Sequence, residues 1–446
     1  MDSDTMPDDR PNLSKRIFRV GALAAALALL LFFVNLLIFD RQGAAQAVER
    51  DITQSWGAPQ TVAGPWLIVP HEVQRVRRVE RKSGRVTEEA YRKRTLITFV
   101  PETVDVDATL RPQTLSRALY ELTVYDADVG LAARFRPQVP DRASVDEGTL
   151  KWADARLMFG VSDPRGLSPE LTVTVNGERA RPEAGIPGEN TRPGMLSVPL
   201  DLTGAPTGPL ALTVNAEMRG SRAIDFVTPG QTTRTNMESI WPHPSFQQVS
   251  PTQSAIGEDG FRATWEVSNL ATGTPLVMTQ TEPPTFSGAV TASVALVEPV
   301  NLYSRLARAT KYGVLFIALS FLTYLLFDII GDRRVSLLGY ALMGLGLVLF
   351  FVLLTALSEH ISFLPAYLGA AATLTLMIAL YSRAILGGTQ PAAILGGLLA
   401  TLYAGLYQLL GLEDFALLTG SLILLAALAA LMYATRNIGR AVPAPA

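Results

Sequence analysis

Hydrophobic residues in this chain are concentrated in six runs of about twenty residues, with more polar stretches between them. An α-helix rises ~1.5 Å per residue, so about twenty apolar residues cross a hydrocarbon core of ~30 Å. The runs therefore predict six transmembrane helices, one near the N-terminus and five in a C-terminal bundle. The predicted helices cover residues 20–39, 312–330, 335–357, 363–381, 391–410 and 415–433.

The first run has two interpretations, an anchor that stays in the protein or a signal peptide that is cleaved. Ala45-Gln46-Ala47 fits the small-x-small pattern of a cleavage site. The run from Val20 to Phe39 is, however, longer than the ~7–15 apolar residues of a typical signal peptide. Its length favours the uncleaved anchor.

Between the first and second runs, the pattern changes to alternation of apolar and polar residues. Leu171–Val175 alternates in this way and runs into Asn176-Gly177, the strongest short signal for a β-hairpin turn. Further strand-like segments are residues 95–99, 120–125, 210–214 and 289–297. The pattern predicts an all-β, sandwich-like domain over residues 40–303, with a short helix at 44–55 just after the anchor.

Basic residues beside the apolar runs indicate the orientation, since cytoplasmic loops are enriched in Lys and Arg. Arg305, Arg308 and Lys311 depart from this rule, but they end a long translocated segment, where the rule has little force. If the chain crosses the membrane at every run, the other basic flanks fall on one side. These flanking residues are Lys15, Arg16, Arg19, Arg333, Arg334, Arg383, Arg436 and Arg440. The sequence thus predicts cytoplasmic tails at 1–19 and 434–446, with residues 40–303 in the periplasm of a bacterium.

The composition excludes several kinds of chemistry. The net charge of −2 gives no sign of a nucleic-acid partner, and the absence of cysteine excludes disulfides and thiol catalysis. The three histidines, His71, His243 and His360, lie far apart in the sequence and show no metal-ligand spacing. We therefore expect no metal and no cofactor.

No sequence motif identifies an enzyme. The chain has no G-x-S-x-G elbow, P-loop or dinucleotide-binding fingerprint. A serine or carboxylate hydrolase stays open as an alternative, because such residues need not be close in sequence. No catalytic residue can be named, and a non-enzymatic protein is the expectation.

Two charged segments are candidate interaction sites. Residues 75–94 form a basic hairpin in which Arg77, Arg78 and Arg81 could contact anionic lipid head groups or lipopolysaccharide. The alternative is a solvated hairpin, neutralised by its own glutamates, and this is favoured. Glu359 and His360 follow the third run, where they are either a proton-sensing pair or an ordinary polar end to the helix.

Several unusual strings occur together in one order along the chain. They are Ser55-Trp56-Gly57, Gly64-Pro65, Asp163-Pro-Arg-Gly-Leu167, Trp241-Pro-His-Pro-Ser-Phe246, Gly260-Phe-Arg-Ala-Thr-Trp265, Arg308-Ala-Thr-Lys-Tyr312, Leu357-Ser-Glu-His360 and Thr435-Arg-Asn-Ile438. In these strings the chain resembles the CreD family of bacterial inner-membrane proteins, from about residue 15 to residue 438. The resemblance implies a role in envelope integrity, within the output of a CreBC-type two-component system, with links to colicin tolerance and β-lactam response. It implies no catalytic mechanism.

The leading hypothesis is an inner-membrane protein whose periplasmic domain binds an unidentified envelope protein or glycan. Trp241, His243 and Phe246 are candidate contact residues, although two prolines in the same string also fit a rigid structural turn. A lipid or small-molecule transporter built on the C-terminal bundle is a second hypothesis, and a periplasmic hydrolase is a third. A transporter is disfavoured because the middle of each predicted helix has no ionisable residue. The sequence does not identify the oligomeric state.

Overall fold

A computed structural model describes most of the chain. The described residues are 13–80, 86–117, 120–137, 148–203, 208–296, 302–330, 335–411 and the single positions 421, 425, 429 and 432. The chain divides into two compact units, one formed by Met1–Gln46 with Val300–Ala446 and the other by Ala47–Pro299. Each unit is described by itself.

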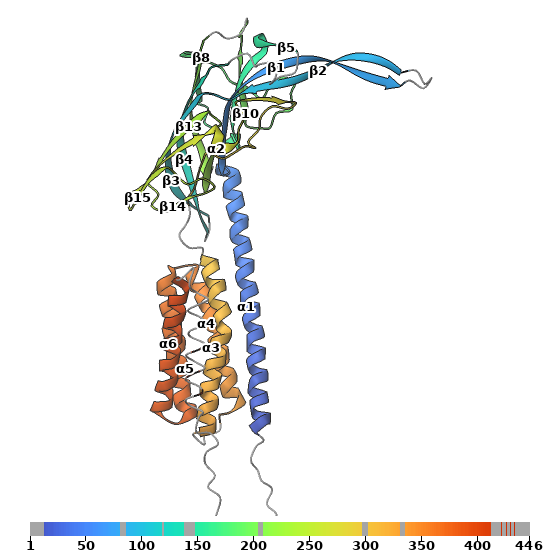
Figure 1. The fold of residues 1–446 in the computed structure, drawn as a ribbon. Helices are drawn as coiled ribbons and strands as arrows, with labels where there is room; N and C mark the ends of the chain where they lie inside the picture. Colours follow the sequence, from blue (N-terminus) through green and yellow to red (C-terminus); the bar gives the residue numbers. More distant parts are fainter. Residues whose placement is uncertain are drawn as a thin grey trace, which may run out of the picture. The chain divides into compact units, whose positions relative to one another are not determined.

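The first unit is helical (Figure 1). Among the described residues, five helices are long and apolar enough to cross a membrane. They are α1 (Leu13–Trp56), α3 (Leu302–Ile330), α4 (Leu337–Ser358), α5 (Phe363–Leu386) and α6 (Thr389–Gly411). This confirms one N-terminal span and a C-terminal bundle, whereas the predicted span at 415–433 lies outside the described residues.

Helix α1 differs from the expectation of an anchor followed by a separate short helix at 44–55. It is one continuous helix of 44 residues that extends far beyond the apolar run. Its second half contains good helix formers such as alanine, glutamine and glutamate, and no proline, so nothing in the sequence stops the helix.

Aromatic side chains fill the interior between the bundle helices. The ring of Tyr403 from α6 lies 4.4 Å from that of Phe350 on α4 and 5.0 Å from that of Phe316 on α3. The hydroxyl of Tyr367 on α5 donates to the carbonyl of Tyr403 at 2.6 Å. These contacts join four helices through one packed centre.

The second unit contains two mixed β-sheets that pack around one core. The larger sheet consists of β1 (Gln60–Glu80), β2 (Val86–Phe99), β5 (Thr149–Leu150), β6 (Ala155–Val161), β9 (Glu183–Ala184), β10 (Met195–Leu200), β12 (Ala223–Val227), β14 (Pro244–Phe246), β17 (Val277–Gln280) and β18 (Ala292–Leu296). The other consists of β3 (Thr103–Arg117), β4 (Tyr120–Phe135), β7 (Thr172–Val175), β8 (Glu178–Ala180), β11 (Leu210–Ser221), β13 (Thr232–Ser239), β15 (Gln253–Gly257) and β16 (Gly260–Ser268). The all-β, sandwich-like prediction is confirmed.

Local sequence explains how the strands share their core. On β3, Val104, Val106 and Ala108 are buried between the sheets, while the alternate Asp105 and Asp107 face outward. The two sheets thereby enclose a common apolar interior, as period-two alternation requires. The predicted hairpin at Asn176-Gly177 joins β7 to β8, and both turn residues have the positive φ that such a turn needs.

Strands β1 and β2 continue beyond the sandwich as a long ribbon (Figure 1). The other neighbours of β1 pair with it no further than Glu72, and β17 pairs with β2 only from Leu96 onward. Within the described residues, positions 73–80 and 86–93 therefore pair only with each other. We call these two segments the arm.

Candidate functional site

The segment with the Trp-Pro-His-Pro-Ser-Phe string links the two sheets of the sandwich. It leaves β13 and becomes β14, which pairs with β18 of the other sheet. Phe246 packs edge-on against Phe261 and Trp265, with ring centroids 5.9 and 5.6 Å away. The half-buried Trp241 donates its indole N–H to the carbonyl of His243 at 3.1 Å. Of the three predicted contact residues, His243 has the exposed side chain, and an interaction role for them stays a prediction.

The basic hairpin forms the arm. Arg78 is exposed, lies opposite Glu88 in the register, and donates from Nε to its carboxylate at 3.1 Å. This pair supplies part of the neutralisation expected from the sequence. The side chain of Arg77 and all of Arg81 lie outside the described residues.

The residues Glu359 and His360 make different contacts at the end of α4. The side chain of Glu359 is only 8% exposed, 3.8 Å from Arg41 Nε, and accepts from the Tyr303 hydroxyl at 3.5 Å. The exposed His360 places Nδ1 3.1 Å from the carbonyl of Ala356. Glu359 thus belongs to a polar contact between three helices of the membrane unit, whereas His360 faces outward.

A cluster missed in the sequence holds the C-terminal end of α1 within the β-rich unit. The carboxylate of Asp163, 7% exposed, accepts from the Ala58 amide at 2.9 Å and from Nε and Nη2 of Arg165, each at 2.8 Å. Arg165 also donates to the carbonyl of Gln54 at 3.1 Å. The hydrogen bonds from Arg165, more than any other contact, lower the pKa of Asp163 to about 2. We call residues 54–60 and 163–166 the joint.

Further contacts close the joint. The buried side chain of Gln60 donates to the carbonyls of Asp163 at 3.1 Å and Arg219 at 2.8 Å. The guanidinium of Arg219 lies 4.7 Å from the ring of Trp56, a cation–π contact. Gly57 has φ +154°, and a Cβ there would meet the Arg219 carbonyl oxygen at 2.8 Å. The strings at 55–57 and 163–167, more than a hundred residues apart in sequence, therefore meet in one place.

The local sequence predicts the turn at Asp163 but not the residues that this turn contacts in the joint. Asp163 followed by Pro164 is a recognisable start for a short helical turn, and Asp163 does accept from the amide of Arg165 at 3.2 Å. The sequence around Asp163 does not indicate that Ala58 and Gln60 are its partners. The contact with the end of α1 depends on the tertiary fold.

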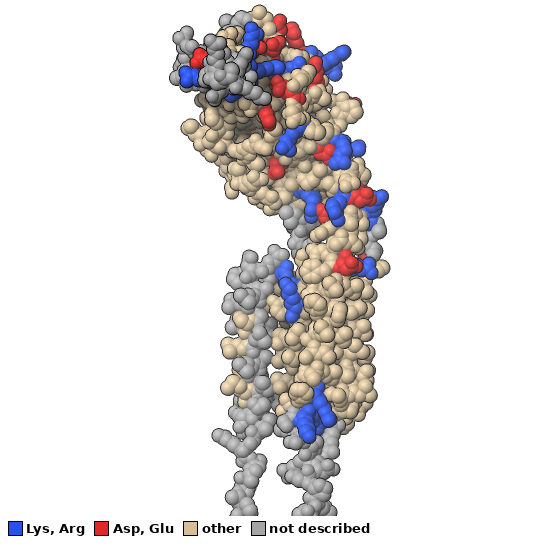
Figure 2. Space-filling model, turned by 90° about the vertical axis from the view of Figure 1, so that its right-hand side faces the viewer, with Lys and Arg blue, Asp and Glu red and all other residues tan. Residues whose placement is uncertain are grey.

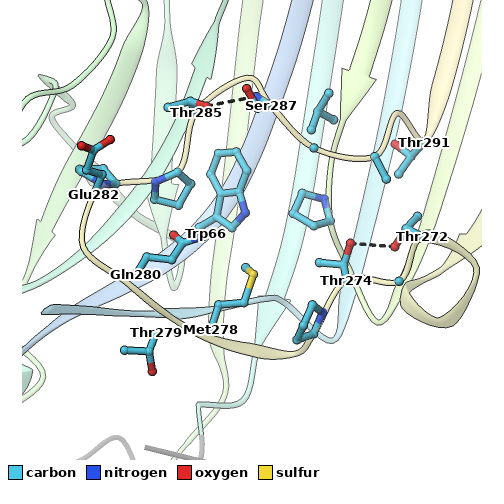
Figure 3. A pocket seen from close by; sticks show the side chains of 18 of the residues that line it. Trp66, Thr272, Thr274, Met278, Thr279, Gln280, Glu282, Thr285, Ser287 and Thr291 are labelled. Atoms are coloured by element: carbon cyan, nitrogen blue, oxygen red, sulfur yellow. Dashed lines mark hydrogen bonds between the residues drawn. The ribbon is translucent and has the colours of Figure 1, made fainter.

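A groove of about 690 Å³ lies on the β-rich unit (Figure 3). The indole of Trp66 reaches between β17 and the segment 281–289, and the rim is polar. The polar rim residues include Thr274, Gln280, Glu282, Thr285 and Ser287. No sequence motif predicts this groove, because its lining comes from three separate parts of the chain, namely Trp66, residues 227–229 and residues 272–291.

A second hollow of about 550 Å³ lies on the outer face of the smaller sheet. Its polar side chains satisfy one another: Asn236 donates to Asp107 at 2.9 Å, Thr264 donates to Asn236 at 3.0 Å, and Arg262 donates to Glu238 at 3.1 Å. This hydrogen-bonded ladder is the ordinary solvent-facing side of a sheet, so the groove beside Trp66 is the stronger candidate.

The distribution of charge separates the two units. In the view of Figure 2, acidic and basic side chains are interspersed over the β-rich unit, while those on the described helices gather near the helix ends.

Within the described residues, no group of three or more His, Asp or Glu side chains could hold a metal ion. Buried His71 places Nδ1 3.2 Å from the Thr95 hydroxyl.

Comparison with solved structures finds only weak likenesses. An M1 zinc metallopeptidase from Deinococcus radiodurans is 12% identical, with a TM-score of 0.22, over 44% of this chain and 42% of that one. A mutant of that enzyme bound to a Tyr-Ser-Ala substrate is 11% identical, with a TM-score of 0.21, over 48% and 53% of the two chains. The chain thus spans about half of these structures, and the scores carry no argument about fold or function.

Comparison of sequences is decisive. The family model described as inner membrane protein CreD matches residues 12–440. The inner membrane protein CreD of Escherichia coli (strain K12) is 30% identical over 430 residues, which cover 95% of this chain and 94% of that protein. The chain therefore belongs to the CreD family of inner membrane proteins.

Proposed function

We propose that this protein supports the integrity of the bacterial cell envelope by binding another envelope component through its β-rich domain. The role follows from what the CreD resemblance implies, including a place in the output of a CreBC-type two-component system. The component is a protein segment or a glycan of the envelope. Binding, rather than catalysis, is the proposed activity.

The topology that accompanies this function has six spans and a periplasmic domain. Both termini are cytoplasmic, residues 40–303 lie in the periplasm, and the sixth span covers 415–433. Support comes from the basic residues in the short cytoplasmic flanks, which lie on one side under strict alternation, whereas Arg305, Arg308 and Lys311 end a long segment, where the rule has little force.

The observation that carries the binding role is the groove beside Trp66. Its volume of about 690 Å³ is within the range of small-molecule and short-segment sites, roughly 300–1,000 Å³. Trp66 in its lining is almost fully buried and offers a ligand little contact area, but the hydroxyl, amide and carboxylate groups of the rim can orient a polar ligand. This combination suits a segment of protein or glycan better than a lipid tail.

The membrane bundle supports an anchoring role more than a transport role. Its described centre is filled by the rings of Phe316, Phe350 and Tyr403. Helices α4 and α6 have no Asp, Glu, Lys, Arg or His. A coupled transporter needs ionisable groups near the midplane and space for its substrate. The filled centre argues against such a space, and the uncharged helices α4 and α6 argue against such groups.

Blocking the groove tests the proposal. Ser287 is exposed on the rim, so Ser287→Trp fills space without disturbing the core, and Ser250→Trp puts the same bulk on an exposed site away from the groove. Each variant is expressed in a deletion strain, and envelope permeability to a dye is measured. Loss of the barrier with Ser287→Trp alone supports the groove, whereas full restoration by both variants contradicts it.

A further inference from the structure

The arm extends further beyond its neighbouring strands than is expected of a hairpin that nothing covers. Eight residue pairs, from Val73 with Lys93 to Glu80 with Val86, extend past the last neighbouring strands. At ~3.4 Å per residue the arm is roughly 27 Å long. A two-stranded ribbon without further cover is at best marginally stable in water. Such a length outside the sandwich indicates a surface on which the arm rests.

The arm carries a net positive charge. The two segments of the arm contain five basic and three acidic residues, a net charge of +2, while the whole chain has −2. Lys93 and Arg92 are exposed on the described part of the arm, and Arg94 follows at its base. The partner of the arm should be anionic.

Two exposed apolar side chains lie among these charges. Val76 is 62% exposed and Tyr91 is 44% exposed. In the register Tyr91 is opposite Arg75, and Lys93 is on the same face two residues along, whereas Val76 follows Arg75 directly and lies on the opposite face. An acidic protein or a soluble polyanion would need the charges but not the apolar groups.

Basic side chains beside an aromatic one are the composition of segments that lie in a membrane interface. Guanidinium groups match phosphate geometry with paired hydrogen bonds, and a tyrosine ring has its apolar body and polar tip at the depth of lipid head groups. We propose that the arm binds a bilayer surface that carries anionic phospholipid through the face that holds Arg75, Tyr91 and Lys93, with the basic groups on lipid phosphates and Tyr91 among the head groups. This goes beyond the proposed function, and it rests on that function only for the side of the membrane.

The test uses the full-length protein held in nanodiscs of phosphatidylcholine. Binding is measured by co-sedimentation with vesicles of phosphatidylcholine, with or without phosphatidylglycerol. Removing two exposed charges in the double variant Arg75→Gln and Lys93→Gln is expected to weaken binding to the anionic vesicles about 25-fold, roughly fivefold for each charge. Tyr91→Ser weakens binding at high salt, where the electrostatic part is screened.

A matched control removes the same charge elsewhere on the β-rich unit. The double variant Arg179→Gln and Arg181→Gln changes two exposed residues outside the arm, and it should bind the anionic vesicles as the unaltered protein does. Equal losses in both double variants, or equal binding to both kinds of vesicle, would overturn the proposal. Unchanged vesicle binding with a loss of self-association in sedimentation velocity would also overturn it, and would assign the arm to a second copy of the chain. Vesicle binding does not depend on the groove, so failure here is distinct from failure of the complementation test.

Discussion

Replacing Asp163 by alanine should release the C-terminal end of α1 from the β-rich unit. The carboxylate accepts hydrogen bonds from the amide of Ala58 and from two nitrogens of Arg165, and it is nearly buried. Arg165 in turn reaches the carbonyl of Gln54 on α1. The joint therefore loses its central acceptor, and the last turn of α1 loses its contact with the loop that contains Asp163.

The structure sets the size of this effect. Lowering the pKa of Asp163 from 3.8 to about 2 corresponds to about 2 kcal/mol, and hydrogen bonds to a charged group contribute ~1.5–3 kcal/mol. Arg165 is 58% exposed, so solvent screening keeps the contribution of the ion pair toward the lower end of that energy range. A loss of about 2 kcal/mol makes opening of the joint roughly 30-fold more frequent.

Hydrogen exchange followed by mass spectrometry measures that opening in the full-length protein. Peptides that contain Gly57 and Ala58 should exchange roughly 30-fold faster in Asp163→Ala, while peptides from β3 and β4 keep their protection. Asp105→Ala, an exposed aspartate on β3, is the matched control and should change nothing at the joint. Unchanged exchange at residues 57–58 in Asp163→Ala would mean that this carboxylate does not hold the joint together.

The same carboxylate predicts how the joint responds to acid. Because the pKa of Asp163 is lower in the folded protein than its ordinary value of 3.8, its contribution is complete above that value and is lost as the pH falls toward about 2. Exchange at the joint, corrected for the intrinsic rate, should therefore be constant between about pH 5 and 8. A change in protection across that range would mean that another group controls the joint.

Three further predictions concern the joint, the sheet link and the topology. Gly57→Ala puts a Cβ against a carbonyl oxygen, so it should raise exchange at the joint without altering the bundle. Phe246→Ala should cost about 2–3 kcal/mol in thermal denaturation of the β-rich unit, whereas exposed His243→Ala should cost less than ~0.5 kcal/mol. Because the chain has no cysteine, single-cysteine variants report topology: a membrane-impermeant maleimide should label Ser254→Cys in intact spheroplasts but not Gln390→Cys.

Patterns of hydrophobicity predicted the features that depend on short segments. A run of twenty apolar residues predicts a span without reference to its neighbours, and Asn176-Gly177 predicts a hairpin because the turn needs positive φ at both residues. The continuous α1 was missed because a polar stretch after an apolar run usually indicates a boundary, although no residue in this stretch breaks a helix.

Contacts between distant segments could not be predicted. The parallel pairing of β1 with β12 joins Gln60 to Ile224, and the joint brings Asp163 to Ala58. The groove likewise needs Trp66 beside β17. In each case the partners satisfy one another only after the fold has formed, so no local periodicity or motif encodes them.

The central claim, that the β-rich domain carries the function and the bundle anchors it, is tested most directly by truncation. A shortened chain of residues 1–303, which keeps α1 and the domain, is expressed in a deletion strain alongside the full-length chain, with export of both checked by fractionation. Envelope permeability to a dye or detergent is then measured. Residues 1–303 should restore the barrier as the full-length protein does. Restoration by the full-length protein alone would contradict the claim and would give the membrane bundle an active part.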